Sequence, residues 1–179
     1  MATITGLTIE DFEQLPESLA RNHELVDGEL VDVSGNTGNH NSLRDALVEL
    51  LRPHVRKHKL GQVISEQEFE FDQNVHGPDV SFIGPEKARV FDGDRRVQLF
   101  VPDLAIEIAS PNDKFAALMT KAHRYRRCGT HEVYVISIET REVFVYSDHF
   151  TGILDENQDF RPQQIPGFSI KISDLFAMM

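Results

Sequence analysis

The stretch "VPDLAIEIASPND", residues 101–113, decides how the rest of the chain is interpreted. Leu104, Ile106 and Ile108 fall on one side of the segment, and Glu107 falls on the other side between two alanines. This period of two is typical of a β-strand, and apolar residues on both sides predict a strand inside a sheet. A buried carboxylate is costly unless it is paired or binds a metal ion, so Glu107 marks a candidate functional site.

The residues after this strand predict a helix and then two more strands. Ser110 and Asp113 have the spacing of a capping box, with Pro111 suited to the first helical position. The apolar stripe of this helix is expected to consist of Phe115, Leu118, Met119, Ala122 and Tyr125, with Gly129 as the stop. The segments "HEVYVISI" and "REVFVYS" read as strands, so the strands of Glu107 and Val135 are expected to be parallel neighbours joined by a crossover.

Upstream of residue 101 the sequence predicts a mixture of short helices and strands. Thr8 and Asp11 indicate the start of a short helix, and Asp27-Gly28 lies between two apolar runs, as in a two-residue hairpin. A longer helix is expected to start at Ser42, with Asp45 completing its capping box, and to end near Gly61. We expect one strand over "QVISEQEFEFD" (62–72), another over "GPDVSFIG" (77–84), and a loop over residues 86–100.

The totals predict one domain of a mixed α/β class. The chain has 179 residues, of which 40% are hydrophobic, and it shows no repeat or linker. The expected parts are an N-terminal helix and hairpin at 8–33, a core at about 40–150 and a C-terminal strand and turn at 165–179. No run approaches the length of a membrane span, the N-terminus does not resemble a secretory signal, and the single cysteine fits a reducing compartment. We therefore expect a cytoplasmic protein.

The net charge of −11, from 29 acidic and 18 basic residues, argues against non-specific binding to a polyanion. Two basic runs weaken that argument. Residues 114–127 carry five basic side chains and no acidic one, and "RPHVRKHK" at 52–59 is a second run. The alternative interpretation of both runs is a solvated helix face.

Two carboxylates stand in apolar strand segments, Asp79 and Glu107. If their strands are adjacent, the two side chains converge at about 5 Å, the lateral spacing of strands. A hard divalent cation relieves the repulsion between two carboxylates, and magnesium is the default choice. The alternative is a buried ion pair with Arg or Lys. Asp103 lies about 13 Å along the strand from Glu107, which favours a role at the strand entry or as a partner for nearby backbone.

Lys121 is the third candidate. Lys114 and Lys121 are seven residues apart on one flank of the predicted helix, beside the sheet. From there Lys121 can reach over the end of the Glu107 strand, where an ammonium group can orient an attacking water and balance developing charge. The alternative is a lysine whose stem covers apolar surface.

These segments together resemble the Uma2 family of restriction endonucleases within the PD-(D/E)XK nuclease superfamily. The resemblance rests on the order of "GPDVSF", "VPDLAIEIASPND" and "TKAHRYRRCGTHEVYVISIETREVFVY". Further agreements are "HELVDGELV" near the start, the "NH" before the long helix and the ending "IPGFSIKISDLF". The likeness runs from about residue 22 to residue 176, and it is the order of the motifs that makes it specific.

The resemblance implies a mixed sheet flanked by helices, a restriction endonuclease-like core and a magnesium-dependent site that cleaves phosphodiesters, in which Mn²⁺ can substitute. Asp79 matches the "PD" aspartate and Glu107 matches the following acid. The lysine expected two residues after that acid is replaced by Ala109, and the family resembles others in which this lysine has moved to the next helix, here to Lys121. Ile108 would contribute its backbone carbonyl to the metal.

Two further residues match family positions. Glu24 corresponds to a family glutamate that can add an acidic contact. His40 corresponds to a family histidine, for which a structural hydrogen bond and a catalytic role are both open. The basic residue that often precedes "PD" is replaced by Gly77, which removes a phosphate contact. Within the basic run, Lys114 and Arg124 are the candidates for contact with DNA.

The sequence therefore predicts a metal-dependent endodeoxyribonuclease that acts on duplex DNA as a homodimer. In this hypothesis the helix start at Ser110 adds a partial positive charge near the phosphate. One alternative is a nuclease-fold protein that no longer cuts and serves as a binding or assembly module. Another is a metal-dependent hydrolase that acts on a smaller substrate.

Overall fold

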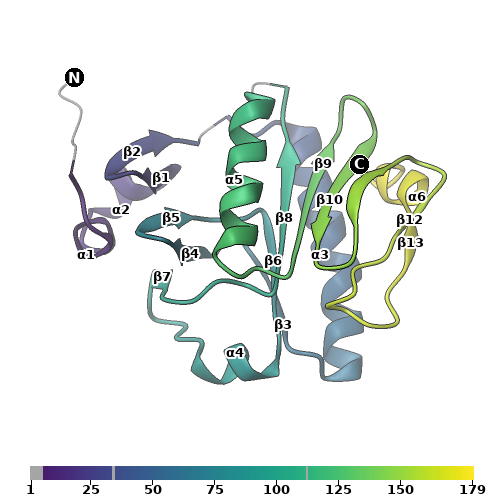
Figure 1. Cartoon of the computed structure of the whole chain (residues 1–179), viewed down its shortest axis with the longest axis horizontal. Helices are drawn as coiled ribbons and strands as arrows, with labels where there is room; N and C mark the ends of the chain where they lie inside the picture. The colour runs from purple at the N-terminus through teal and green to yellow at the C-terminus, as the bar shows by residue number, and fades with distance from the viewer. Residues whose placement is uncertain (1–5, 34, 112) are drawn as a thin grey trace.

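The fold is a mixed α+β arrangement built on a central six-stranded sheet (Figure 1). The computed structural model describes residues 6–33, 35–111 and 113–179. The strands of the central sheet lie in the order β11-β10-β9-β8-β6-β3. Their bounds are β3 Gln62–Ser65, β6 Val80–Ile83, β8 Leu104–Ala109, β9 Glu132–Ser137, β10 Glu142–Ser147 and β11 Thr151–Leu154.

Two strand pairings matter for the site: the first was predicted from the sequence, and the second is the adjacency on which the expected convergence of Asp79 and Glu107 depended. Strand β8 runs parallel to β9, with Glu107 opposite Val135, so the predicted crossover is confirmed. Strand β8 pairs antiparallel with β6, with Val80 opposite Ile106. Asp79 directly precedes β6, and the segments of Asp79 and Glu107 are therefore neighbours.

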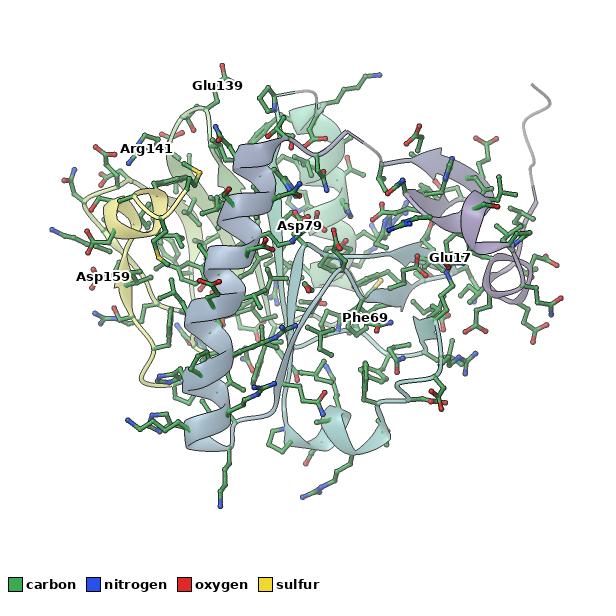
Figure 2. All side chains as sticks on the ribbon, turned by 180° about the vertical axis from the view of Figure 1, so that it is seen from behind. Glu17, Phe69, Asp79, Glu139, Arg141 and Asp159 are labelled. Atoms are coloured by element: carbon green, nitrogen blue, oxygen red, sulfur yellow. The ribbon has the colours of Figure 1, made fainter. Side chains whose placement is uncertain are left out.

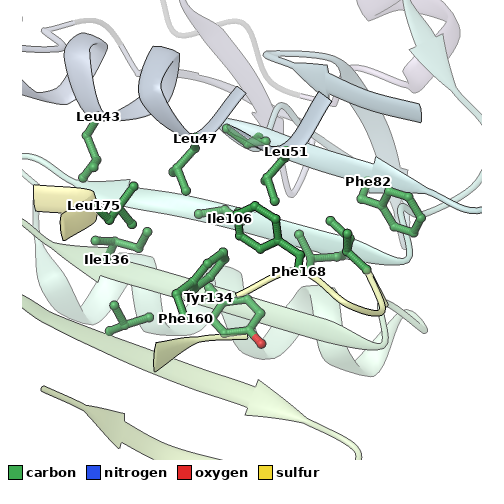
Figure 3. Close-up of a cluster of buried hydrophobic side chains, with 14 of the residues drawn as sticks. Leu43, Leu47, Leu51, Phe82, Ile106, Tyr134, Ile136, Phe160, Phe168 and Leu175 are labelled. Carbon is green, nitrogen blue, oxygen red and sulfur yellow. The ribbon is translucent and has the colours of Figure 1, made fainter. Parts of the chain in front are cut away.

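Two helices cover opposite faces of the central sheet, α3 (Gly38–His58) behind it and α5 (Phe115–Arg127) in front of it (Figure 1). Helix α3 packs on the sheet through Leu43, Leu47 and Leu51, which are fully buried. The C-terminal elements β12 (Asp159–Phe160), β13 (Ile170–Lys171) and α6 (Ile172–Phe176) close this side of the core. Figure 3 shows Phe160, Phe168 and Leu175 packed beside Ile106 and Ile136.

A second sheet of five strands adjoins the first, in the order β2-β1-β5-β4-β7. Its strands are β1 His23–Val26, β2 Glu29–Asp32, β4 Glu68–Phe71, β5 Asn74–His76 and β7 Val97–Gln98, and the short helices are α1 Ile9–Glu13, α2 Glu17–Ala20 and α4 Pro85–Val90. The predicted hairpin is confirmed: Val26 pairs with Glu29, and Asp27 and Gly28 both have positive φ. Thr8 and Asp11 form the predicted capping box.

The single strand predicted over residues 62–72 is wrong. The segment contains β3 and β4, which belong to different sheets. Between them Glu66 adopts a left-handed φ of 55°, which turns the chain out of the central sheet. A β-hairpin of β4 and β5 follows, and the chain returns through Gly77 to β6. Alternation of apolar and polar residues reports a strand but not its partners, so it could not show this break.

The loop predicted over residues 86–100 is also wrong in part, because the segment contains α4 and β7. Helix α3 starts four residues earlier than expected. It begins at Gly38, and the side chain of Thr37 accepts the cap hydrogen bond from the His40 N–H. The same helix ends on Lys59, which itself takes the left-handed conformation that was expected of Gly61.

The helix predicted to begin after Ser110 begins at Phe115, with Lys114 as its N-cap. The Ser110–Asp113 pair forms a turn instead: the Ser110 N–H donates to Asp113 Oδ2 at 2.6 Å, and the Asp113 N–H donates to the Ser110 carbonyl. The helix start therefore does not lie at Ser110. Phe115, expected in the buried stripe, is 44% exposed, whereas Ala122 and Tyr125 are fully buried.

The structure contains no helix with the length and apolar character needed to span a membrane, within the three described ranges. The expectation about the N-terminus rests partly on residues 1–5, which lie outside the described residues.

Candidate active site at the fork between the sheets

The candidate residues meet where the two sheets diverge. Asp79 lies at the return of the chain into the central sheet, and Figure 2 labels it beside the N-terminal half of α3. Glu107 comes from β8 and Glu24 from β1 of the second sheet. All three carboxylates are buried, with exposed fractions of 6% for Glu24, 9% for Asp79 and 4% for Glu107.

Asp79 is held from two sides. Its Oδ2 accepts a hydrogen bond from the Ile108 backbone N–H at 2.7 Å. Its Oδ1 lies 3.1 Å from Nε2 of His40, near the start of α3. Burial opposes the charged form of His40, but the hydrogen bond and charge of Asp79 raise its pKa above the usual value. The carboxylate is therefore fixed between β8 and α3.

Glu107 is fixed from helix α5. Its Oε1 accepts a hydrogen bond from the Tyr125 hydroxyl at 2.7 Å and lies 3.0 Å from Nζ of Lys121. Burial raises the pKa of Glu107 to about 7; the charge of Lys121 opposes this shift, whereas the neighbouring carboxylates increase it. Burial is thus the main reason that the charged form of Glu107 is disfavoured.

Glu24 approaches the same lysine from the second sheet. Its Oε1 lies 2.7 Å from Nζ of Lys121 and accepts a hydrogen bond from the Gly77 N–H at 3.1 Å. Its Oε2 lies 2.7 Å from Nδ1 of His76. Burial by itself would raise the pKa of Glu24, but Lys121 and His76 outweigh burial and lower it to about 2.

Lys121 thus lies between two carboxylates from different sheets. Only 15% of its side chain is exposed, and despite this burial Glu107 and Glu24 raise its pKa above the ordinary lysine value. Asp79, Glu107 and Lys121 are brought together. The contact between Glu107 and Lys121 is also the buried ion pair that the alternative interpretation described.

The other predicted residues lie as follows. Only 13% of the Arg124 side chain is exposed, and its guanidinium contacts Nε2 of His76 at 3.2 Å and Asp27 at 3.4 Å, so it is directed into the fork. Lys114 is exposed at the start of α5. Asp103 accepts hydrogen bonds from the Gly84 N–H and from Lys87, which is the backbone and strand-entry role predicted for it.

Magnesium binding depends on the oxygen donors that the site can offer. Within residues 6–33, 35–111 and 113–179, no group of three or more His, Cys, Asp or Glu side chains is arranged around one metal position. Magnesium, however, needs only one or two carboxylates, with water and phosphate oxygens completing its shell. Asp79 lies close enough to Glu107 to raise the pKa of that carboxyl group, although burial is the larger cause. Asp79 and Glu107 therefore fit such an ion chemically.

Two contributors to the site escaped the sequence analysis, His76 and the hydroxyl of Tyr125. The signal for His76 was its position in "NVHGPD", where a polar ring stands in an apolar strand three residues before Asp79. The ring is buried, with 3% exposed. Tyr125 was expected only as part of the buried stripe, because helical spacing does not report which polar atom a tyrosine reaches.

Comparisons with known proteins identify the family and the fold of this chain. The model of the Uma2 family, described as "Putative restriction endonuclease", matches residues 9–173. One solved structure, from Anabaena variabilis ATCC 29413, is described as a "putative nuclease belonging to DUF820". It superposes with a TM-score of 0.85 at 22% identity, over 97% of this chain and 99% of that chain. No curated protein matches the sequence. The predicted restriction endonuclease-like fold, a mixed sheet flanked by helices, is confirmed.

Proposed function

Because the chain belongs to the Uma2 family of restriction endonucleases, we propose that it is a magnesium-dependent endonuclease that hydrolyses phosphodiester bonds in duplex DNA. One observation carries the proposal: the Lys121 ammonium group lies 3.0 Å from Glu107, and Asp79 lies in the neighbouring segment of the same sheet. Two carboxylates for a cation and one ammonium for a phosphate and its attacking water are the groups that this hydrolysis needs.

Asp79, Glu107 and the Ile108 carbonyl would hold the cation, with Mn²⁺ able to replace Mg²⁺. The N–H and C=O of one strand residue point to the same edge of the strand, and the Ile108 N–H faces Asp79, which supports this role for its carbonyl. When bound, the cation polarises a phosphate oxygen and lowers the pKa of the attacking water.

Lys121 orients the attacking water and stabilises charge on the phosphate. Its raised pKa keeps the ammonium protonated at neutral pH, so it acts as a hydrogen-bond donor and a positive charge, not as a general base. His40 fixes the orientation of Asp79. Lys114, exposed where α5 begins, contacts the DNA backbone.

The decisive experiment is Glu107→Ala, with Asp79→Asn as a second variant. Both are expected to lose Mg²⁺-dependent nicking and cleavage of plasmid DNA while circular dichroism shows a folded protein. Asp103→Asn is the matched control, because Asp103 carries the same charge just before the same strand but bonds to Gly84 and Lys87. The proposal fails if Glu107→Ala cleaves as fast as the wild type.

A second candidate function is a nuclease-fold protein that binds or assembles without cutting. It is favoured by the net charge of −11 and by Lys121, which already serves as the cation between Glu24 and Glu107. Calorimetric titration with Mg²⁺ or Mn²⁺ separates the two functions. No metal binding at millimolar concentration favours the second function, and metal-dependent cleavage of mononucleotides alone favours a hydrolase of smaller substrates.

We also propose that the enzyme acts as a homodimer on both strands of a duplex. The described residues contain one cluster of this kind per chain, and cleavage of both strands in one encounter needs two active sites. Light scattering should give twice the mass of the 20.4 kDa chain. A monomer that only nicks plasmid DNA would contradict this part of the proposal.

A further inference from the structure

We propose that Glu24, His76 and Arg124 form a relay that positions the Lys121 ammonium group, so that the second sheet completes an active site built on the first. None of these three residues contacts the proposed cation, and each acts through its neighbour. The inference rests on the proposed function for the role of Lys121. Its geometry stands independently of that role.

The need for such a relay follows from the lysine side chain. A four-carbon stem loses considerable rotamer entropy when its end is fixed, and one partner leaves Nζ free to swing. Here Nζ lies 3.0 Å from Glu107 and 2.7 Å from Glu24. Two carboxylates on different sheets define its position from two sides.

The hydrogen-bond chemistry fixes the direction of every contact in the relay. The Arg124 guanidinium can only donate, so Nε2 of His76, 3.2 Å away, must accept. His76 then carries its proton on Nδ1 and donates it to Oε2 of Glu24 at 2.7 Å. The Gly77 N–H donates to Oε1 of Glu24 at 3.1 Å. Glu24 is thereby held so that Oε1 faces Lys121.

The surrounding packing supports a neutral, immobile His76. Its ring lies edge-on to Tyr125 at 5.6 Å and near Phe71 at 5.8 Å, and Phe71 stacks on Tyr125 at 4.1 Å. Burial lowers the pKa of His76, which keeps the ring neutral although it contacts Glu24. The same Tyr125 donates to Glu107, so the two carboxylates that hold Lys121 are anchored to one aromatic cluster.

If these contacts only joined the two sheets, their loss would lower stability and leave kcat unchanged. Measurements of kcat therefore separate a structural role from a positioning role. Glu24→Gln places an amide NH₂ among donors and removes the charge facing Lys121. We expect kcat to fall about 10- to 100-fold, the range typical of residues that orient a catalytic group, with KM and metal affinity unchanged. In His76→Leu the kcat should fall by the same factor. In His76→Asn, whose amide can donate from near the Nδ1 position, most of the wild-type kcat should be retained.

Glu68→Gln is the matched control. Glu68 also lies in the second sheet and pairs with an arginine, Arg96, at 2.7 Å, but its partner lies outside the relay. We expect this variant to stay folded and to keep kcat. An unchanged kcat in folded Glu24→Gln, or an equal loss in Glu68→Gln, would overturn the relay.

Nitrogen NMR provides a readout that needs no substrate. In the wild type we expect His76 to be protonated on Nδ1 and unprotonated on Nε2, and the Lys121 ammonium protons to exchange slowly enough to be observed. Arg124→Met should mix the His76 tautomers, and Glu24→Gln should abolish the ammonium signal. A wild-type protein that cleaves nothing would refute the proposed function but not the relay, because the NMR signals of His76 and Lys121 test the relay without substrate. A His76 ring protonated on Nε2 would refute the relay.

Discussion

Glu107 places a carboxyl group in a strand that is buried on both faces, and its neighbours show how it is tolerated there. Tyr125 and Lys121 both donate to it, yet its pKa stays raised, mainly because of burial and in addition because of two further carboxylates. Water is excluded from this carboxyl group, so each donor to it matters.

We predict that Tyr125→Phe destabilises the protein by about 1.5–3 kcal/mol, the usual contribution of a hydrogen bond to a charged group. The ring stays stacked on Phe71, so packing is kept and only the hydroxyl that donates to Glu107 is lost. Urea unfolding measures the loss. Tyr146→Phe is the control, because its half-buried hydroxyl contacts only a methionine sulfur, and it should cost less.

The residues of the site differ in how far the sequence could predict them. Asp79 and Glu107 stood out because each is an acid in an apolar strand, and Lys121 because helical spacing put it beside the sheet. His76 and Glu24 are 52 residues apart, and their contact depends on how the second sheet folds against the first. No local pattern carries that information, so the partners of Lys121 became visible only in three dimensions.

Among the helices and strands, the predicted hairpin and the predicted crossover are confirmed, whereas the predicted starts of α3 and α5 are wrong. The crossover from β8 to β9 follows from chirality and connection length, which the sequence displays. The start of α5 does not, because Ser110 and Asp113 satisfy each other in a turn as well as in a helix cap. Cap signals identify residues that can bond locally, and tertiary packing selects the structure in which they do.

The left-handed end of α3 gives a prediction about a single helix. Lys59 has a φ of 53°, which strains a side-chain-bearing residue and suits glycine. We predict that Lys59→Gly stabilises the protein by about 1 kcal/mol. Thermal or urea unfolding shows whether the free energy of unfolding rises or falls. Lys57→Gly, inside the same helix, should instead destabilise by about 1 kcal/mol, and two changes of the same sign would contradict the explanation.

Helix α1 is tied to the second sheet by an acid-sensitive contact. Arg95 donates to both oxygens of Glu13 at 2.8 and 3.0 Å, and these hydrogen bonds lower the pKa of Glu13 below the ordinary glutamate value of 4.5. Because the folded-state pKa is the lower one, the stabilisation is fully present above pH 4.5 and is lost as the pH falls through the folded-state value.

We therefore predict that Glu13→Gln is less stable than the wild type at pH 7, by less than about 1 kcal/mol because the pair is partly solvated. The difference should shrink towards zero at pH 3, where the wild-type carboxyl is also protonated. Urea midpoints of both proteins at the two pH values test this. A difference that grows on acidification would have the wrong sign.

At the scale of the whole molecule, the basic residue Lys121 lies in a protein of net negative charge. The fork joins the two sheets, and its basic residues form ion pairs with acidic residues of the same chain: Lys121 with Glu24 and Glu107, and Arg124 with Asp27. The net charge of −11 opposes the approach of DNA over distances up to the Debye length, about 10 Å at 0.1 M salt. For the proposed action on DNA, this charge predicts binding through close contacts and not through long-range attraction.

This charge distribution predicts a weak salt dependence. A protein that neutralises Z phosphates loses affinity with a slope of about −0.9Z in a plot of log K against log salt. Because the net charge is −11, we expect for the proposed action on DNA a slope shallower than about −3, measured by fluorescence anisotropy with a short duplex and Ca²⁺ in place of Mg²⁺ to prevent cleavage. Lys114→Ala should flatten the slope by about one unit. A slope steeper than about −6 would contradict this expectation, and it would point to the basic run at 52–59 or to contacts supplied by a second copy.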